Sequence, residues 1–249
     1  MTAAELPAPV RLLRYETLGS TSDEAKDLAA KGAASWTAVW ARSQTAARGR
    51  RQRAWAAPPG NLYLSIILRP PGPPAAVAQL GFAAALAVAD SLAPLLAPPE
   101  RLRLKWPNDV LVDGRKIAGI LLESAAARDG VDWLVVGIGV NLASHPEGTE
   151  TPATSLAAAG VPAEVETVLQ ALLVAFQRWV DRWEREGFEP LRRAWLARAQ
   201  GLGEVVGVRL ERESFTGRFL DLDRDGALLL ETGAGPRRVA AGEVFTAAA

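Results

Sequence analysis

The stretch RLRLKWPNDVLVDGRKIAGILLES, residues 101–124, decides how the middle of the chain folds and where its polar groups gather. Its first residues alternate apolar and charged side chains, which predicts a strand with one buried face. Pro107 ends that strand, because its ring fixes φ and removes a backbone donor. A second strand over 110–112 turns at Asp113-Gly114, a dipeptide typical of tight hairpins, into the apolar run 117–122. We therefore expect four polar side chains to be held beside buried strands: Lys105, Asn108, Asp109 and Lys116.

Composition excludes several classes of protein. With 249 residues, 49% of them hydrophobic, the chain can bury a large core in one or two domains. Its 28 Lys and Arg balance 28 Asp and Glu, so no global field favours nucleic acid or a membrane. It has no Cys, which excludes disulfides and thiolate chemistry, and its single His argues against a zinc site or a Ser-His-Asp triad.

No targeting signal is evident. The first residues lack a basic region followed by an apolar one, and no uncharged apolar run reaches the roughly 20 residues of a membrane helix. We therefore expect a soluble cytoplasmic protein with no membrane partner.

Hydrophobic periodicity predicts a mixture of helices and strands. Further strands are expected at 10–15, 37–41, 62–68 and 131–138, and the last should pair with 117–122. Helices are expected at about 20–31, 75–92, 163–186 and 189–199. From residue 204 the chain changes to short strands and turns, which is typical of a small β-barrel. We therefore predict two domains, 1–202 and 203–249.

The hydroxyl cluster Gly19-Ser20-Thr21-Ser22 comes at the start of the first predicted helix. Such residues commonly cap helices, and taken alone this is the favoured interpretation. The alternative is that the hydroxyls hydrogen-bond the polar head of a ligand.

An Arg-rich segment follows the second predicted strand, in the sequence SQTAARGRRQRAWAAPP, residues 43–59. It has no acidic residue, and we expect it to become ordered only around an anion. Three interpretations are open: a solvated basic loop, a nucleic-acid arm with Trp55 for stacking, or a loop that binds phosphate and carboxylate groups. The arginines concerned are Arg42, Arg48, Arg50, Arg51 and Arg53.

The segment Gly137-Ile138-Gly139-Val140-Asn141 ends the strand predicted over 131–138. It is not a dinucleotide fingerprint, because a third glycine and a following helix are missing. We interpret it as a strand end where two glycines let another group approach the backbone, with the Asn141 amide as donor and acceptor. His145, in the loop beyond, is assigned no role.

Together these motifs suit the activation of a small acid by a polyphosphate. A carboxylate that attacks the α-phosphorus of ATP is itself an anion, so fixed positive groups must cancel the repulsion and hold the reactants in line. No nucleophilic side chain is needed, consistent with the absence of Cys. The cations available are Arg48, Arg50, Arg51, Arg53, Lys105 and Lys116.

The sequence resembles the biotin protein ligases, also called biotin–[acetyl-CoA-carboxylase] ligases. The matching motifs occur in the family's order, and the Trp-Pro-Asn-Asp and Gly-Arg-Lys-Ile-Ala-Gly-Ile-Leu pieces are highly specific. They are Gly19–Ser22, Gln44, Ala47–Arg53 with Trp55, Gly60–Ser65, Lys105–Asp109, Gly114–Leu121 and Gly137–Asn141.

The resemblance implies a role for each matching residue. Lys116, Arg48 and Arg50 would act in catalysis. Biotin would be bound by Ser20, Thr21, Ser22, Gln44, Arg48, Gly49, Arg50 and Lys116. The nucleotide would be bound by Arg51, Arg53, Trp55, Lys105, Asn108, Asp109 and Asn141. No metal ligand is identified.

The resemblance also implies the reaction and the fold. Biotin and ATP, accompanied by Mg²⁺, would give biotinyl-5′-AMP and pyrophosphate, and a lysine of a biotin carrier domain of a biotin-dependent carboxylase would then attack the adenylate. The fold would be α+β, a mixed-sheet catalytic domain of the biotin/lipoate ligase type with a small C-terminal SH3-like β-barrel. A homodimer through the sheet is permitted.

The sequence departs from the family pattern at three positions. Ala47 and Gln52 stand where the loop commonly has glycines, which bears on its flexibility, and Ser22 stands where Asn is common. Some relatives carry an N-terminal DNA-binding domain, for which about ten residues before the first strand are too few, so we predict no nucleic-acid partner.

Three alternative functions are set against this one. A lipoate or octanoate ligase would share the adenylate chemistry, although the polar Ser20–Ser22 end and Gln44 favour biotin. A nucleic-acid module would require a more basic chain. A ligand sensor without catalytic turnover would have nothing to lose from Lys116→Ala.

Overall fold

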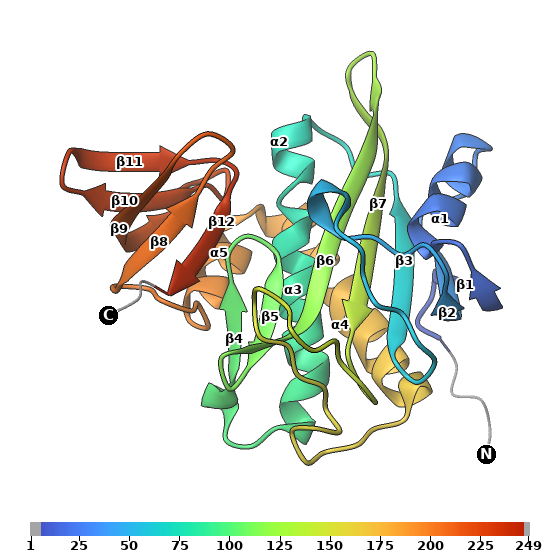
Figure 1. The fold of residues 1–249 in the computed structure, drawn as a ribbon. Coiled ribbons are helices and arrows are strands. Elements are labelled where there is room, and N and C mark those ends of the chain that lie inside the picture. Colours follow the sequence, from blue (N-terminus) through green and yellow to red (C-terminus); the bar gives the residue numbers. More distant parts are fainter. Residues whose placement is uncertain (1–5, 247–249) are drawn as a thin grey trace.

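Two β-sheets organise the protein, whose computed structural model describes residues 6–246 (Figure 1). The larger sheet has seven strands within these residues. In spatial order they are β1 (Arg11–Leu18), β2 (Thr37–Gln44), β3 (Leu62–Leu68), β7 (Gly130–Val140), β6 (Arg115–Ala127), β5 (Asp109–Val112) and β4 (Leu102–Lys105). Only β1 and β2 run parallel, connected through α1 (Thr21–Ala30), and the other neighbours are antiparallel, so the sheet is mixed.

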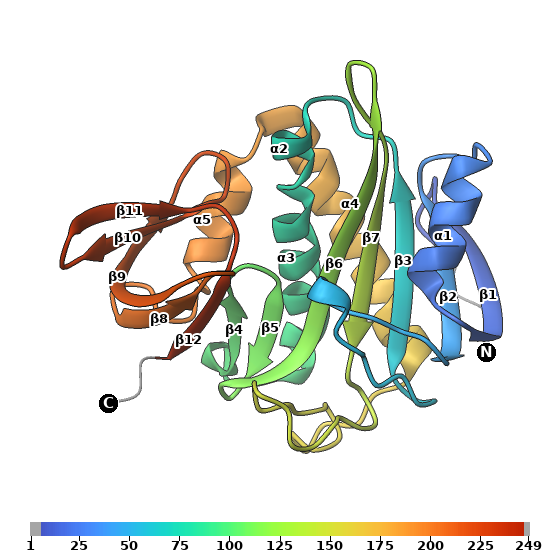
Figure 2. The same ribbon diagram turned by 45° about the horizontal axis from the view of Figure 1, so that its top comes forward.

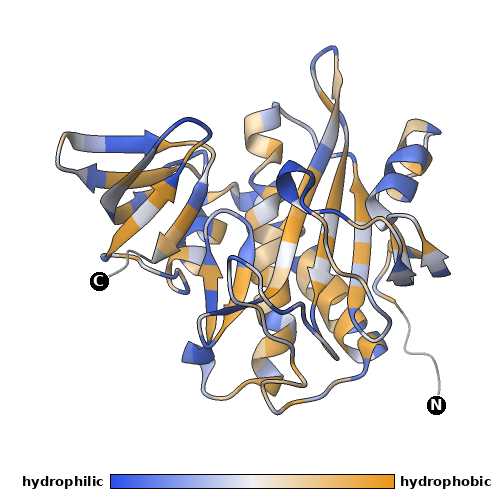
Figure 3. Ribbon diagram, in the orientation of Figure 1, coloured by the Kyte–Doolittle hydropathy of each residue, from blue (hydrophilic) through white to orange (hydrophobic). Residues whose placement is uncertain are grey.

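Helices cover both faces of the large sheet (Figure 2). On β3, Ile67 packs with Ala25 and Ala29 of α1, whereas Leu62, Leu64 and the other even-numbered residues face the main core. That core includes α3 (Leu80–Leu92) and α4 (Val165–Glu186). Because successive side chains of a strand point to opposite faces, a strand that is buried at every position, as β3 is, fits a sheet covered on both sides. Figure 3 shows this hydrophobic centre in orange.

The helical segment Pro74–Leu95 is long and apolar enough to cross a membrane, judged by length and composition alone. It comprises α2 (Pro74–Val77) and α3, and its most apolar window is 72% buried inside the fold. Its hydrophobicity is therefore accounted for by its position in the core, between the sheet and α4.

The hairpin predicted at Asp113-Gly114 is confirmed. Both residues adopt positive φ, +50° and +74°, which is the backbone of the turn that best joins antiparallel strands. Arg101 Nη2 donates to Asp113 Oδ2 at 2.8 Å and fixes the turn from outside. Lys116 thereby leaves the turn at a set position on β6.

The smaller sheet is antiparallel and lies beside β4 and β5 (Figure 1). Its order is β11 (Gly235–Val239), β10 (Leu228–Thr232), β9 (Ser214–Leu222), β8 (Val205–Arg209) and β12 (Glu243–Thr246). Hydrogen bonds join it to the rest of the chain. Trp106 Nε1 donates to Gly226 O at 3.0 Å, and Arg192 Nε of α5 (Glu189–Leu196) donates to Leu222 O at 2.7 Å.

Most predicted elements are present, with two differences. The helix predicted over 75–92 is divided between α2 and α3. The helix predicted to reach Ala199 ends at Leu196, because the next residues pair with β4: Leu104 N donates to Arg198 O and Gln200 N donates to Leu104 O, both at 2.8 Å. A backbone pairing over this sequence separation cannot be read from local periodicity.

We predict that Gly226→Ala destabilises the protein by about 2–3 kcal/mol, through strain and overpacking. Gly226 has φ +84°, and an added Cβ would lie 2.6 Å from Cε2 of Phe82. The free energy of unfolding in urea would report the change. Gly233→Ala is the matched control, because a Cβ there meets nothing within 4 Å. Equal stabilities of the two variants would contradict the prediction.

Candidate active site

A cavity of about 520 Å³ opens between the large sheet, the Arg-rich loop and strand β12. It is lined by nearly all the residues that the sequence singled out: Ser20, Thr21, Ser22, Gln44, Arg48, Gly49, Arg50, Arg53, Trp55, Lys105, Asn108, Asp109, Lys116 and Asn141. Arg51 and Arg42 are exceptions, since neither lines the cavity; Arg51 pairs with Glu243 at 3.5 Å and Arg42 with Glu16 at 3.6 Å. Motifs as far apart in the sequence as those of Ser20 and Asn141 thus line the same cavity.

One end of the cavity is a buried cluster of hydroxyl groups. Ser65 Oγ lies 2.9 Å from Thr21 Oγ1 and 3.1 Å from Ser22 Oγ, and Gln44 Oε1 accepts from Thr21 N at 2.7 Å. Ser20 Oγ accepts from Asp23 N and caps α1, so the capping interpretation holds for Ser20. Thr21 and Ser22 are buried and face the cavity, as the ligand interpretation requires. This end suits a small polar head with donors and acceptors.

The floor of the cavity consists of glycines on the paired strands β6 and β7. Gly119 pairs with Gly139, and Leu121 pairs with Gly137. A Cβ added to Gly139 would lie 2.9 Å from Trp55 Cε2, and one added to Gly137 would lie 2.7 Å from Ser22 Oγ. Close approach of other groups to Gly137 and Gly139 was expected from the sequence, and it is found: Ser22 approaches Gly137 and Trp55 lies on Gly139.

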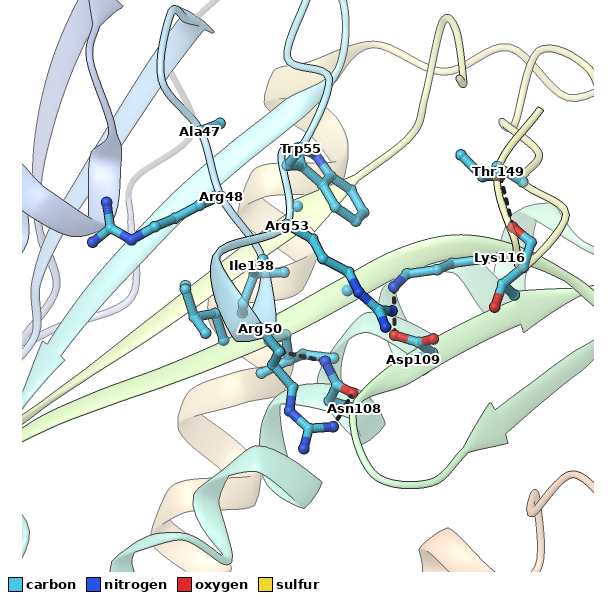
Figure 4. Close-up of a pocket in the computed structure, with 18 of the residues that line it drawn as sticks. Ala47, Arg48, Arg50, Arg53, Trp55, Asn108, Asp109, Lys116, Ile138 and Thr149 are labelled. Atoms are coloured by element: carbon cyan, nitrogen blue, oxygen red, sulfur yellow. Dashed lines mark hydrogen bonds and ion pairs between the residues drawn. The ribbon is translucent and has the colours of Figure 1, made fainter. Parts of the chain in front are cut away.

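The other end of the cavity gathers cations (Figure 4). Lys116 Nζ pairs with Asp109 Oδ1 at 2.6 Å, and Arg50 Nη1 donates to Asn108 Oδ1 at 3.2 Å. Burial lowers the pKa of Lys105, and burial together with the neighbouring Arg51 lowers the pKa of Arg50. Desolvated cations bind an anion more strongly than solvated ones do, so this end suits a polyphosphate.

The Arg-rich loop extends across the cavity, and its two arms are hydrogen-bonded to each other. Gly49 N donates to Arg53 O at 2.8 Å and Trp55 N donates to Ala47 O at 3.0 Å, and the 3-10 turn Arg50–Gln52 forms its tip. Gln52 adopts φ +59° where the family commonly has glycine, a conformation that costs a side-chain-bearing residue of order 1 kcal/mol.

The loop's arginines contact carboxylates from elsewhere in the chain. Arg48 pairs with Asp23 at 2.5 Å, and Arg53 pairs with Glu243 at 2.9 Å. The expectation that the loop orders only around an anion did not include these internal partners, because Asp23 and Glu243 are distant in sequence.

Several residues of the cavity were missed by the sequence analysis. Glu243 and Phe245 come from β12, and Lys105 Nζ lies 5.1 Å from the centroid of the Phe245 ring. Glu150 and Thr151 come from the loop after β7, where Lys116 N donates to Pro152 O at 2.7 Å. No local pattern marks these residues, since only the fold brings them to the motifs.

Two buried polar atoms at the cavity have neither a hydrogen-bond nor an ion-pair partner within the described part of the chain, Asn141 Oδ1 and Trp55 Nε1; Asp109 Oδ1 is paired with Lys116. The Asn141 amide is otherwise fixed, because its Nδ2 donates to Thr154 O at 3.0 Å. Unpaired buried polar atoms are costly, so these two offer an acceptor and a donor to a ligand.

Comparison with known proteins agrees with this geometry. The model of the biotin/lipoate A/B protein ligase family matches residues 20–197, and that of the biotin protein ligase C terminal domain matches residues 201–246. The chain therefore belongs to the biotin/lipoate A/B protein ligase family.

Individual relatives point the same way. A biotin–[acetyl-CoA-carboxylase] ligase from Paracoccus denitrificans is 44% identical over 91% of this chain and 96% of its own. The bifunctional ligase/repressor BirA from Bacillus subtilis is 35% identical over 94% of this chain and 73% of its own. A biotin protein ligase from Aquifex aeolicus, solved with biotin and ATP, has a TM-score of 0.80 at 28% identity and covers 94% of this chain and 97% of its own.

We predict a pH-dependent role for Tyr63, a buried wall of the cavity that donates to Pro58 O at 2.7 Å. Burial raises its pKa to about 12. The unfolded phenol ionises near pH 10, so its stabilising contribution is complete below about pH 10 and is lost as the pH rises towards 12.

Tyr63→Phe should therefore lower the free energy of unfolding by about 1 kcal/mol at pH 8, from the lost hydrogen bond, and by less at pH 11. Urea unfolding at both pH values measures the difference. Tyr15→Phe, outside the cavity, is a second test of the same effect, because Tyr15 Oη donates to Glu24 Oε1 at 3.1 Å and burial raises the pKa of Tyr15 as well. A deficit that stays constant between the two pH values would contradict the assignment.

Proposed function

We propose that this protein is an ATP-dependent ligase that converts biotin to biotinyl-5′-AMP and transfers the biotinyl group to a lysine of a biotin carrier protein, such as the carrier subunit of acetyl-CoA carboxylase. One observation carries the proposal: a single cavity joins a buried hydroxyl cluster to a cationic end over a glycine floor. A ureido head, an apolar acyl chain and a carboxylate beside a triphosphate match these three parts in order.

In the first half-reaction the biotin carboxylate oxygen attacks the α-phosphorus of ATP, and the bond from that phosphorus to the bridging oxygen of pyrophosphate breaks. Lys116, on β6 at the cationic end, neutralises the carboxylate and then the anhydride oxygen. Arg53 and Lys105 take up charge on the leaving pyrophosphate. The protein would raise the reaction rate by orienting the two reactants and by supplying fixed positive charge, with no covalent enzyme intermediate.

In the second half-reaction a neutral lysine amine of the carrier attacks the acyl carbon of the adenylate, and an amide forms as AMP leaves. The AMP takes the electron pair of the broken C–O bond, and the ammonium formed loses a proton. We further propose that the two half-reactions take place in the cytoplasm. The homodimer that the resemblance permits stays a prediction.

Mg²⁺ is proposed to enter with the nucleotide. Among residues 6–246 no group of three or more His, Cys, Asp or Glu is arranged to hold a metal. Mg²⁺ is usually bound by phosphates, waters and one or two carboxylates, so this absence fits an ion carried by ATP. Asp109 and Glu243 are the cavity carboxylates nearest to the cations, and either would complete its coordination. The ion would neutralise phosphate charge.

The alternative substrates are lipoate and octanoate, since the family model covers both biotin and lipoate ligases. Neither acid has a ureido group. The hydroxyls of Thr21, Ser22 and Ser65 already pair among themselves, so an apolar chain would not leave them unpaired. Biotin is favoured because its ureido group can add hydrogen bonds to the Thr21 and Ser22 hydroxyls that line the cavity, which neither of the other acids can do.

We predict ATP–pyrophosphate exchange that depends on biotin and is absent with lipoate or octanoate. The exchange of labelled pyrophosphate into ATP reports the first half-reaction alone and needs no carrier. Exchange with lipoate or octanoate instead would replace the substrate and keep the mechanism. If none of the three acids supports exchange, the ligase assignment is wrong.

We predict that Lys116→Ala lowers the exchange rate by about 100-fold or more, because a partly buried charge at the developing anhydride is lost. Arg115→Ala is the matched control, since it removes the exposed cation next to Lys116 and should change the rate by less than roughly twofold. Similar rates for the two variants would remove Lys116 from the reaction.

A further inference from the structure

The side chain of Arg48 turns away from the reacting end of the cavity. Figure 4 shows it pointing away from Lys116 and Asp109. Its guanidinium donates to both Asp23 carboxylate oxygens, Nη1 to Oδ2 and Nη2 to Oδ1, each at 2.5 Å. Nη2 also donates to Glu123 Oε1 at 3.2 Å. Arg48 therefore bridges the loop to α1 and to β6.

A second cation completes the group. Lys26 Nζ lies 2.9 Å from Asp23 Oδ1 and 2.8 Å from Glu123 Oε1. Two cations thus alternate with two carboxylates, and the group, which we call the loop clasp (Asp23, Lys26, Arg48 and Glu123), has no net charge. Because its charges balance, its ion pairs can persist whether or not an anion is bound elsewhere in the cavity.

The loop clasp is partly shielded from water. The side chains of Arg48, Glu123 and Lys26 are 18%, 23% and 27% exposed, whereas Asp23 is 48% exposed. Hydrogen bonds from Arg48 hold the pKa of Asp23 well below its usual range, so its charge is present at neutral pH. A bidentate pair within a network exceeds the usual contribution of an isolated surface ion pair.

The loop clasp also fixes Trp55. Arg48 and Ala54 form a β-bridge at the base of the loop, and Trp55 N donates to the neighbouring Ala47 O at 3.0 Å. Anchoring Arg48 to α1 therefore sets where the indole lies on Gly119 and Gly139. The indole therefore lines the cavity over its glycine floor and shapes the space between the hydroxyl end and the cationic end.

We propose that the loop clasp is a positioning device that holds the Arg-rich loop over the acyl part of the bound adenylate and slows its escape. The inference rests on the proposed function. Asp23 would then be a positioning residue that helps to retain the adenylate. Arg48, for which the resemblance implied a role in catalysis and biotin binding, would instead anchor the loop. Retention is useful because a mixed anhydride released into water is hydrolysed or acylates other amines.

The test compares Asp23→Asn with Asp132→Asn. Asp132 is the matched control, because it also pairs with an arginine, Arg69 at 2.9 Å, and is 53% exposed, but this pair does not include a residue of the Arg-rich loop. Biotinyl-adenylate is formed on the enzyme from labelled biotin and ATP, and its release is followed after a chase with excess unlabelled biotin. The KM for ATP and the melting temperature are measured in parallel.

We expect Asp23→Asn to speed adenylate release about fivefold, which corresponds to about 1 kcal/mol of lost ion pairing. The KM for ATP should change less than roughly twofold, because the arginines at the loop tip are untouched. Asp132→Asn should release adenylate at the wild-type rate. A merely structural role would lower the melting temperature of both Asn variants and leave the release rate unchanged.

A double-mutant cycle with Arg48→Gln separates the pair from other effects. In the Asp23→Asn background, Arg48→Gln should add less than roughly twofold, since the bidentate partner is already gone and only the 3.2 Å contact with Glu123 remains. Release from Asp23→Asn at the wild-type rate, or fully multiplicative effects, overturns the inference. Absence of any adenylate on the wild-type protein would instead overturn the proposed function, so the two failures are distinguishable.

Discussion

The antiparallel pairing of β6 with β7 is the constraint on which the site depends. Its register sets Gly119 opposite Gly139, and the same two strands bring Lys116 and Asn141 to the cavity. A shift of one residue would turn side chains onto the floor and the glycines elsewhere. The site is therefore built on central strands of the sheet, where backbone position is well fixed, and the Arg-rich loop lies over them.

The cavity combines two kinds of electrostatic environment. The hydroxyl end is neutral and satisfied by its own short hydrogen bonds, whereas the cationic end holds lysines and arginines against carboxylates of the same chain. Such internal pairing reduces the cost of gathering like charges before a ligand arrives. It also means that a phosphate bound here competes with Asp109 and Glu243 for the same cations. Its net binding free energy is therefore smaller than it would be with unpaired cations.

Local sequence patterns predicted most of the fold and many of the residues at the site. Alternation gave the strands, Asp113-Gly114 gave the hairpin, and the resemblance named residues of which all but Arg51 line the cavity. What could not be predicted depends on contacts between distant segments. Two examples are the pairing of residues 198–200 with β4 and the contact of Glu243 with the Arg-rich loop. Local hydrophobic periodicity does not indicate either of them, because each depends on how separate elements pack.

The hydrogen bond from Trp106 to Gly226 has a consequence for modularity. Trp106 belongs to the Lys-Trp-Pro-Asn-Asp motif of the site, yet its indole is bound by a turn of the small sheet. Gly226 also packs on Phe82, which is buried with Phe188 and Trp195. A chain cut at the predicted boundary would leave this aromatic group facing water and the motif without its support. The support of the motif therefore comes in part from the smaller sheet, through Gly226.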